Sequence, residues 1–406
     1  MKSSVPFINA THMMRAFGIG LMTIMFPLLA AAYGLHAVTI GIIISVSVFF
    51  GAIYTFVFTR AASRFGAVPF IVISSLMFLA SAVIYFQHHG LGLLFVSILG
   101  FIPPIGGIFA SALEEGVLSH VPSAQRTRSY ALYGMMGTAG GALGSLAAGF
   151  PEAVGLSFSS EVNVLLAVYG IVSLSAVVLS TFLFATSRRH RVKIADTAEP
   201  STASRHLIKS RGIVYRLAGL FVIDASGSGV VTTPLLVYWL HTHFGMSSPH
   251  LALLFFGEQL LEAISFPLAE RLSRHLGLLN TAVFTHIPSS LLLIAVPFSP
   301  NGMIVALLLL VRGLLVEMDV PTRQSYIAAV VQPTERVEAA GITSIGKQIG
   351  RAIGPVMGGL MLGTFGTLVP FIGGGVLKIC YDLTLWQSFR HIKPLASDNM
   401  VHTLEE

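Results

Sequence analysis

The chain has 406 residues, of which 54% are hydrophobic and 10% are charged, and its mean hydropathy is +0.80. A soluble fold of this size cannot bury that much apolar surface, so the composition indicates an integral membrane protein. The formal net charge of +6 does not indicate nucleic acid, because the basic residues fall in short segments between apolar runs. The single cysteine, Cys380, excludes an intramolecular disulfide.

A spanning helix needs about 20 mainly apolar residues, so charged, proline and glycine clusters divide the chain into candidate spans. Twelve result, at residues 13–33, 40–58, 69–87, 91–112, 129–150, 162–185, 213–240, 250–270, 279–298, 303–320, 339–363 and 367–387. Lys2 followed by an apolar run resembles a cleavable signal peptide, but cleavage would remove part of the internal repeat described below. We therefore expect the first segment to span the membrane.

Lysine and arginine mark the cytoplasmic side, since cytoplasmic loops are enriched in them. With the N-terminus inside, the cytoplasmic connections hold Arg60, Arg64, Arg126, Arg128, Arg271, Arg274, Arg323, Arg336 and a dense group from Arg188 to Arg216. The six expected external loops hold neither residue type. This predicts a multi-pass protein of the inner (cytoplasmic) membrane with both termini in the cytoplasm.

The two halves of the chain repeat each other at an offset of about 210 positions. The matched pairs are Arg126 with Arg336, Gly140 with Gly350, Gly144 with Gly354 and Gly149 with Gly359. The same comparison aligns RAASRFG (Arg60, Arg64, Gly66) with RLSRHLG (Arg271, Arg274, Gly277). We expect a six-helix unit at 1–187, a basic cytoplasmic linker at 188–212, a second unit at 213–388 and a cytoplasmic tail at 389–406.

Six plus six repeated spans around a basic linker resemble the major facilitator superfamily of secondary transporters. RAASRFG is similar to the family's loop signature G-x-x-x-D-R-x-G-R-R, although Ser63 replaces the acid and Ala67 the following base. The resemblance implies an all-α membrane protein whose twelve transmembrane helices form two six-helix bundles related by pseudo-symmetry. It also implies a monomer in the lipid bilayer, without a cofactor, that moves a small molecule by alternating access.

A glycine motif extends the resemblance. Gly350, Gly354, Pro355, Gly358 and Gly359 reproduce the pattern G-x-x-x-G-P-x-x-G-G that is associated with antiporters of the superfamily. Here the motif lies in the eleventh span, whereas the family's signature belongs to the fifth, which has the looser series Gly140, Gly144 and Gly149. Glycines four residues apart line one helix face, so we expect close helix packing along both rows.

Charged residues inside the spans are candidates for a substrate or proton pathway, because an intramembrane cation costs at least about 2.5–3.5 kcal/mol unless it has a partner. They are Asp224, Glu258, Glu262, Arg312, Lys347 and Arg351, with Arg15, Glu114 and Glu115 in the first half. A transport site and a purely structural network both fit this set. For Lys378 and Asp382 we expect a salt bridge within one helix, and for His286 a hydrogen-bonded packing role.

The leading prediction is proton-coupled export of a small organic compound. Uptake or exchange of an anionic metabolite, with Arg312 and Arg351 binding the anion, is an alternative, and a non-transporting receptor is a third. The chain has no nucleophile elbow, P-loop or H-E-x-x-H motif, so we expect no catalytic residue and no enzyme. His88, His89, His241 and His243 lack carboxylates or cysteines at ligand spacing, so we expect no metal site.

Overall fold

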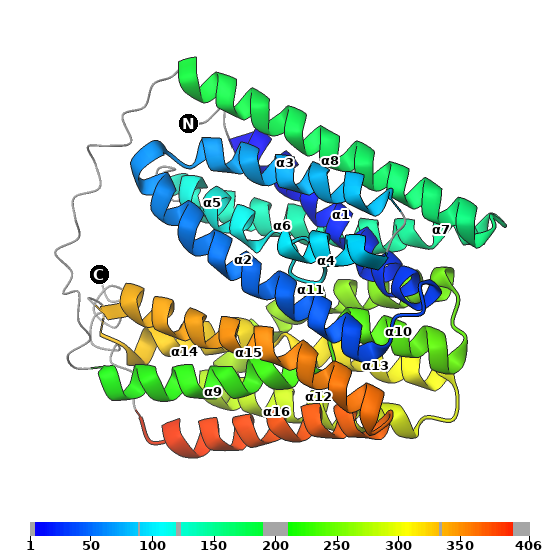
Figure 1. The fold of residues 1–406 in the computed structure, drawn as a ribbon. Helices are drawn as coiled ribbons and strands as arrows, with labels where there is room; N and C mark the ends of the chain where they lie inside the picture. The colour runs from blue at the N-terminus through cyan, green and yellow to red at the C-terminus, as the bar shows by residue number, and fades with distance from the viewer. Residues whose placement is uncertain (1–4, 88–89, 119–122, 190–209, 333–334, 393–406) are drawn as a thin grey trace. The chain divides into compact units, whose positions relative to one another are not determined.

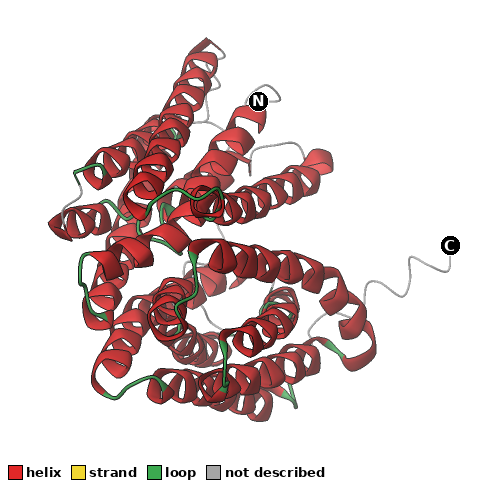
Figure 2. Cartoon of the chain, turned by 90° about the vertical axis from the view of Figure 1, so that its right-hand side faces the viewer, coloured by secondary structure: helices red, strands yellow, loops and turns green. Residues whose placement is uncertain are grey.

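The computed structural model describes residues 5–87, 90–118, 123–189, 210–332 and 335–392. Within these ranges the chain folds into α-helices and the short 3-10 helix η2 (Val296–Phe298) (Figures 1 and 2). In chain order the helices are α1 (Val5–Ala32), α2 (Ala37–Phe65), α3 (Val68–Tyr85), α4 (Gly90–Ile98), α5 (Ile108–Leu118), α6 (Ser123–Ala148), α7 (Phe150–Ala153), α8 (Phe158–Arg189), α9 (Arg211–Val230), α10 (Thr233–Phe244), α11 (Ser248–Leu276), α12 (Leu278–Ala295), α13 (Gly302–Val316), α14 (Asp319–Val330), α15 (Arg336–Thr364) and α16 (Leu368–Phe389). Most of the predicted linker and tail lies outside the described residues.

Eight helical stretches in the described ranges are long and apolar enough to cross a membrane. The pair α9 and α10 counts as one of them, and α13 is apolar but shorter. The glycine-rich helices α6 and α15, which occupy the predicted fifth and eleventh spans, are not among the eight. The fold therefore contains helices that can span a membrane, while the total of twelve spans stays a prediction.

Several predicted spans are interrupted. The segment expected at 91–112 forms two helices, α4 and α5, and the connection between them contains Gly100 and Gly107 with φ of 74° and 71°. Positive φ is a conformation that glycine adopts without strain, which explains the break. The seventh span is divided before α10, where Pro234 occupies the first turn and cannot donate a backbone hydrogen bond. The segments predicted at 91–112 and 213–240 are therefore each made of two helices.

The chain divides into two compact units. Unit 1 contains Met1–Thr197, Thr232–Gln259 and Pro355–Thr364, and unit 2 contains Ala198–Val231, Leu260–Gly354 and Phe365–Glu406. In unit 1, α1 packs on α6 and α8, and α3 packs on α8. In unit 2, α16 packs on α9 and α12, and α12 packs on α13 and α14. The domain boundaries predicted from the repeat stay a prediction.

The glycine rows lie against helix backbones. A Cβ at Gly140 would lie 2.6 Å from the carbonyl oxygen of Met13, and one at Gly144 would overlap the carbonyl of Phe17, both on α1. In unit 2 the equivalent atoms would lie 2.5 Å from the carbonyl oxygen of Val222 for Gly350, and 2.7 Å from that of Ser226 for Gly354. Gly140 and Gly144 thus press α6 against α1, and Gly350 and Gly354 press α15 against α9, at backbone distance.

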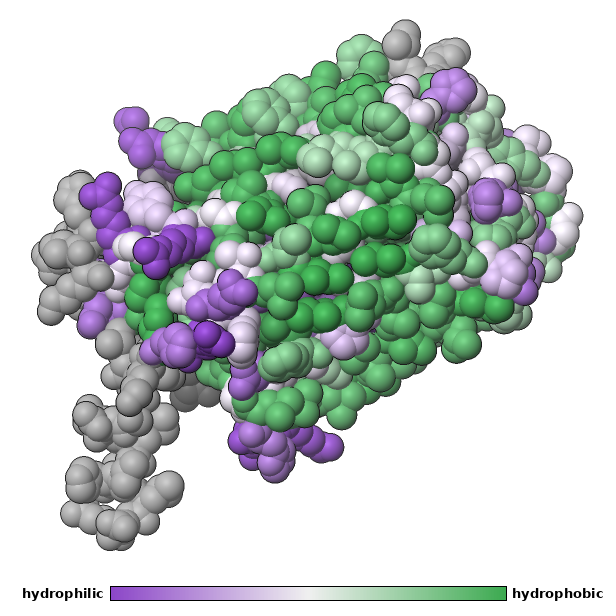
Figure 3. All heavy atoms as spheres, turned by 90° about the horizontal axis from the view of Figure 1, so that it is seen from below, coloured by the Kyte–Doolittle hydropathy of each residue, from purple (hydrophilic) through white to green (hydrophobic). Residues whose placement is uncertain are grey.

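The outer surface is largely apolar. Figure 3 shows one face on which hydrophobic residues cover most of the area and hydrophilic residues gather toward its margins. Large exposed hydrophobic side chains include Phe56 at 70% and Met303 at 79% of their full accessibility. Exposed hydrophobic side chains of this kind are unfavourable in water in large patches and favourable against lipid chains.

Candidate functional site

The charged residues of unit 2 converge on Arg323 of α14. Arg323 Nη1 donates to Asp224 Oδ2 of α9 at 2.9 Å and forms an ion pair with Asp319 Oδ2 at 2.8 Å. The side chain of Arg323 is 7% exposed, and the Asp224 and Asp319 side chains are 11% and 7% exposed. A guanidinium buried between two carboxylates is held in place, because each of the three charges would be costly to bury alone.

Arg323 is the main correction to the sequence interpretation. The residue was expected in a cytoplasmic loop after a span at 303–320, whereas α14 is a helix and carries Arg323 into the interior of unit 2. Asp319 lies one turn earlier on the same helix, so both residues reach the same cluster. Arg323 therefore does not contribute to the charge of an exposed cytoplasmic loop.

Lys378 of α16 approaches the other oxygen of Asp224. Its Nζ lies 3.9 Å from Asp224 Oδ1 and donates to Ser228 Oγ at 2.8 Å. Asp224 Oδ1 is buried and has no hydrogen-bond partner among the described residues. One carboxylate oxygen of Asp224 is thus fixed by Arg323, while the second interacts with Lys378 only at the limit of an ion pair.

In place of the predicted salt bridge between Lys378 and Asp382, each of the two residues interacts with a partner on another helix. Lys378 turns to Ser228 and Asp224, and Asp382 lies 2.9 Å from His286 Nδ1 of α12 through both of its oxygens. Residues four apart on a helix can pair, but partners on neighbouring helices compete when the residues are buried. His286 is 2% exposed and hydrogen-bonded, as its predicted packing role requires.

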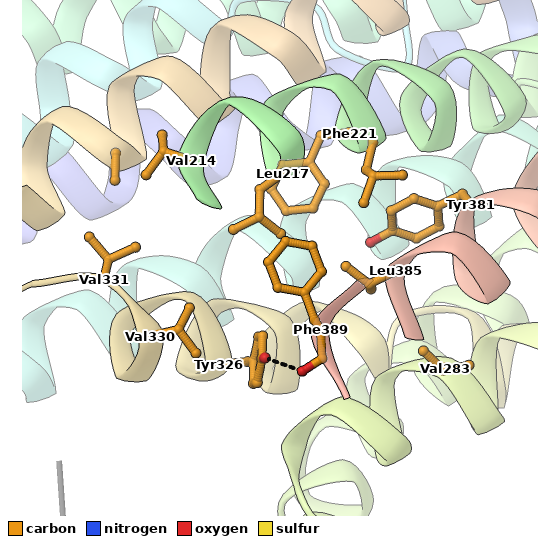
Figure 4. Close-up of a cluster of buried hydrophobic side chains, with 12 residues drawn as sticks. Val214, Leu217, Phe221, Val283, Tyr326, Val330, Val331, Tyr381, Leu385 and Phe389 are labelled. Atoms are coloured by element: carbon orange, nitrogen blue, oxygen red, sulfur yellow. Dashed lines mark hydrogen bonds between the residues drawn. The ribbon is translucent and has the colours of Figure 1, made fainter. Parts of the chain in front are cut away.

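Two aromatic residues of the buried core of unit 2, Phe221 and Tyr381 (Figure 4), contact Arg323. The Arg323 guanidinium lies 4.9 Å from the centroid of the Phe221 ring and donates to the Tyr381 hydroxyl at 3.2 Å. Lys347 Nζ lies 5.0 Å from the same Phe221 centroid. Both cations gain cation–π attraction from this ring. Phe221 and Tyr381 belong to a buried core with Leu217, Leu385 and Phe389, so both rings are closely packed.

The other predicted site residues occupy different surroundings. Arg351, one turn beyond Lys347 on α15, is exposed, and Arg312 of α13 is partly buried. Glu258 is 7% exposed and belongs to unit 1, whereas Glu262 belongs to unit 2. The structure thus joins Asp224 and Lys347 to the Arg323 cluster through direct contacts or through Phe221. The functional roles of all six residues stay predictions.

Unit 1 contains a second buried ion pair, between Arg15 of α1 and Glu114 of α5. Arg15 Nη1 and Nη2 donate to the two oxygens of Glu114 at 2.8 and 2.6 Å, and Glu114 is fully buried. Tyr133 donates its hydroxyl to Glu114 Oε2 at 2.8 Å, and its ring stacks on His12 at 3.8 Å. Both oxygens of Glu114 are therefore satisfied, in contrast to those of Asp224.

A sequence signal for both pairs existed. An offset of about 209 positions places Arg15 on Asp224 and Glu114 on Arg323. The two partners are 99 residues apart in each pair. The repeat therefore carries an ion pair at the same place twice, with the signs of the charges exchanged. Comparing charges as well as glycines across the repeat would have identified Arg323.

The loop motifs end their helices in the same way. Gly66 after α2 and Gly277 after α11 have φ of 86° and 84°. Arg60, Arg64, Arg271 and Arg274 are exposed, and Arg274 bonds Glu270 at 2.5 Å. Within the described ranges no group of acidic, histidine and cysteine side chains could hold a metal ion, and His88 and His89 lie outside them.

Comparison with known proteins gives the family. The model of the Major Facilitator Superfamily matches residues 8–233 and 218–399. An uncharacterized membrane protein of Saccharomyces cerevisiae, YJR124C, is 26% identical over 416 residues, covering 94% of this chain and 93% of the relative. The multidrug resistance protein MdtG of Citrobacter koseri is 31% identical over 205 residues, which are 48% of each chain.

Solved structures agree with this fold. A bacterial homologue of the lysosomal transporter Spinster has a TM-score of 0.74 at 13% identity and covers 98% of this chain and 99% of its own. The xylose transporter XylE of E. coli has a TM-score of 0.72 at 13% identity, with 98% of both chains covered. The chain is thus a multi-pass membrane transporter and not an enzyme, and it belongs to the Major Facilitator Superfamily.

Proposed function

We propose that this transporter exports a small organic compound in exchange for protons, and that Asp224 is the carboxylate that binds the proton. The observation that carries the proposal is the buried Oδ1 of Asp224, which has no hydrogen-bond partner among the described residues. A buried carboxylate oxygen without such a partner is a favourable position for a proton or for a donor group of a substrate. The partial similarity to a multidrug resistance protein supports export.

Exchange follows from competition for one oxygen. A proton on Asp224 neutralises one of the two carboxylates that surround Arg323, while Asp319 stays bonded to the guanidinium. A cationic or hydrogen-bond-donating substrate needs the ionised form of Asp224, so the proton and the substrate exclude each other. Release of one then permits binding of the other, which is the requirement for antiport when the site faces the two sides of the membrane alternately.

The test uses purified protein in proteoliposomes with an imposed pH gradient. A panel of lipophilic drugs, sugars, nucleosides and organic anions is screened by mass spectrometry, and a trapped pH-sensitive dye reports proton movement. For a compound that is transported, Asp224→Asn should abolish both substrate-driven proton movement and substrate exchange while the protein stays folded, because asparagine resembles the protonated acid, which excludes the substrate. Wild-type flux that is unaffected by the pH gradient would refute the proton coupling.

Glu114→Gln is the matched control, since Glu114 occupies the equivalent ion pair in unit 1. Its two oxygens bond Arg15 and Tyr133, so the substitution should weaken the fold and lower gradient-driven flux and exchange together. A selective loss of proton coupling in Glu114→Gln, with Asp224→Asn still coupled, would move the proton site to unit 1.

A second candidate is uptake or exchange of an anionic metabolite. It is favoured by Lys347 and Arg351, which lie one turn apart on α15 and do not take part in the ion pairs found among the described residues. Two adjacent cations can bind a carboxylate or phosphate group. Flux of an organic anion that is lost in Lys347→Gln and Arg351→Gln, while drugs are not transported, would support this function over export.

For both functions we expect a monomer. We also expect both termini in the cytoplasm, since lysine and arginine concentrate in the connections on that side.

A further inference from the structure

Two carboxylates converge on the first residue of α11. Ser248 donates from its backbone N to Glu152 Oε2 of α7 at 2.7 Å, and its Oγ lies 2.7 Å from the same oxygen. The Oγ also lies 2.6 Å from Glu161 Oε1 in the first turn of α8. Ser248 and Glu161 are 2% and 3% exposed. All three residues belong to unit 1, and we call them the Ser248 latch.

The latch needs one more hydrogen than its ionised form contains. A serine hydroxyl carries a single hydrogen, and an ionised carboxylate only accepts hydrogen bonds. With both glutamates ionised, the Ser248 hydroxyl can donate its hydrogen to only one of them. The other carboxylate would then face the lone pairs of Ser248 Oγ at hydrogen-bond distance, which is repulsive. Both short contacts form only when one carboxylic acid donates to Ser248 Oγ.

The proton belongs on Glu161. Glu152 Oε2 already accepts from the Ser248 backbone N, and an ionised oxygen accepts two bonds better than the hydroxyl oxygen of an acid. The hydroxyl of Ser248 therefore donates to Glu152, and the acid of Glu161 donates to Ser248 Oγ. This arrangement also leaves the more exposed carboxylate, Glu152, as the charged one.

We propose that the Ser248 latch is a proton-operated connection between α11 and the segment α7–α8, closed when Glu161 holds its proton and released when it loses it. The latch joins the first repeat to the second, at the ends of helices that we expect on the external side. Loss of the proton brings two negative charges against one hydroxyl and removes one hydrogen bond, so alkaline pH should separate α11 from α7 and α8. Only the side of the membrane from which the proton reaches Glu161 depends on the proposed orientation of the chain.

The packing around the latch shows how closely it holds the helices. A Cβ at Gly149 would lie 2.7 Å from Cα of Pro249 and 3.1 Å from the carbonyl oxygen of Ser248. The other titratable groups near it are histidines. His241 of α10 acts electrostatically on Glu161 and bonds the Met246 carbonyl through Nδ1 at 3.0 Å, and His250 of α11 bonds Ser247 Oγ at 2.6 Å. Their protonation must be separated from that of Glu161 in the experiment.

The experiment measures the distance between spin labels by pulsed electron spin resonance in reconstituted protein. Labels are attached at Val154→Cys and Leu253→Cys in a Cys380→Ser background, since both positions are exposed and flank the latch. We expect one short distance at acidic pH and a longer population that grows as the pH rises. Glu161→Gln should keep the short distance at every pH, because the amide NH₂ replaces the acid as donor to Ser248 Oγ.

The control variants separate the alternatives. Glu270→Gln, an exposed glutamate of α11, and His241→Gln should both keep the wild-type pH response, and Ser248→Ala should show the longer distance even at acidic pH. Infrared difference spectra should show a protonated carboxyl band that is lost in Glu161→Gln and retained in Glu270→Gln. Three outcomes would overturn the proposal: a wild-type distance that does not change with pH, a normal pH response in Glu161→Gln, or loss of the pH response in His241→Gln. These distances are measured without a substrate, so they are independent of the role of Asp224.

Discussion

Replacing Gly354 with alanine tests whether the glycine row of α15 packs at backbone distance. The new Cβ would overlap Cα of Gly229 and lie 2.7 Å from the carbonyl oxygen of Ser226, so α15 must move away from α9. The neighbouring atoms belong to the backbone and cannot rotate aside. Forcing an extra methyl group into a packed site costs about 1–3 kcal/mol, and the better helix propensity of alanine offsets about 0.5–1 kcal/mol of that loss.

Gly341→Ala on the same helix is the matched control, because nothing lies within 4 Å of the position of its added Cβ. Only the propensity term applies there, so this variant should be as stable as the wild type or more stable by up to about 1 kcal/mol. Gly354→Ala should lose about 1–2 kcal/mol, which lowers the folded-to-unfolded ratio by roughly tenfold.

The assay is unfolding in mixed detergent micelles, followed by tryptophan fluorescence, with flux measured on the same preparations. In unit 1, Gly144→Ala and Gly134→Ala form an equivalent comparison on α6, since only Gly144 faces a backbone, that of Phe17. If Gly354→Ala and Gly341→Ala unfold together, the close contact of α15 with α9 does not contribute to stability, and the packing argument fails.

Three further predictions concern topology and charge. In a Cys380→Ser background, cysteines at Leu156 and His250 should react with an impermeant maleimide from outside and a cysteine at Arg274 only after permeabilisation; reaction at Arg274 in intact cells would reverse the topology. Arg15→Met should destabilise the protein by about 3–5 kcal/mol, because it leaves Glu114 buried without its cation. Arg274→Met, at an exposed pair, should change the stability by only about 0–1 kcal/mol. Equal thermal stability of the two variants would contradict a stabilising role of the buried pair. If Arg351 binds an anion bidentately, Arg351→Lys should fold normally but transport poorly and Arg351→Ala should transport no better, so full flux in both variants would exclude the role.

Apolar length and the repeat predicted most of the fold from the sequence. Runs of about 20 apolar residues predict helices because backbone groups inside a bilayer must bond within their own segment. The breaks within the predicted spans were harder to predict from the sequence. The turn between α4 and α5 depends on positive φ at Gly100 and Gly107, yet many other glycines of this chain lie inside helices. Composition alone does not tell these two uses of glycine apart.

The candidate site was predicted only in part, for a physical reason. Asp224 was identified because a single acid inside an apolar run has few structural explanations. Arg323 lies in the polar stretch MDVPTRQSY, which suits a loop by composition and becomes helix α14 in the fold. Arg323 is buried against the carboxylate of Asp224 on another helix, and this partner is 99 residues away in the sequence, so the composition of the stretch does not reveal it.

The two ion pairs show how a repeated fold can acquire different roles in its two halves. Exchanging the charges between partners keeps the Coulomb attraction of a pair, so Arg15–Glu114 and Asp224–Arg323 can stabilise equivalent helices equally well. What differs is the bonding of the carboxylate. Glu114 accepts from Arg15 through both oxygens and from Tyr133, whereas Asp224 is bonded by Arg323 through one oxygen only. Protonating Glu114 would break several charge-assisted bonds, while protonating Asp224 at Oδ1 would break none of them. Under the proposed exchange for protons, the difference in hydrogen bonding, rather than in fold, therefore makes the second repeat the better place for the proton.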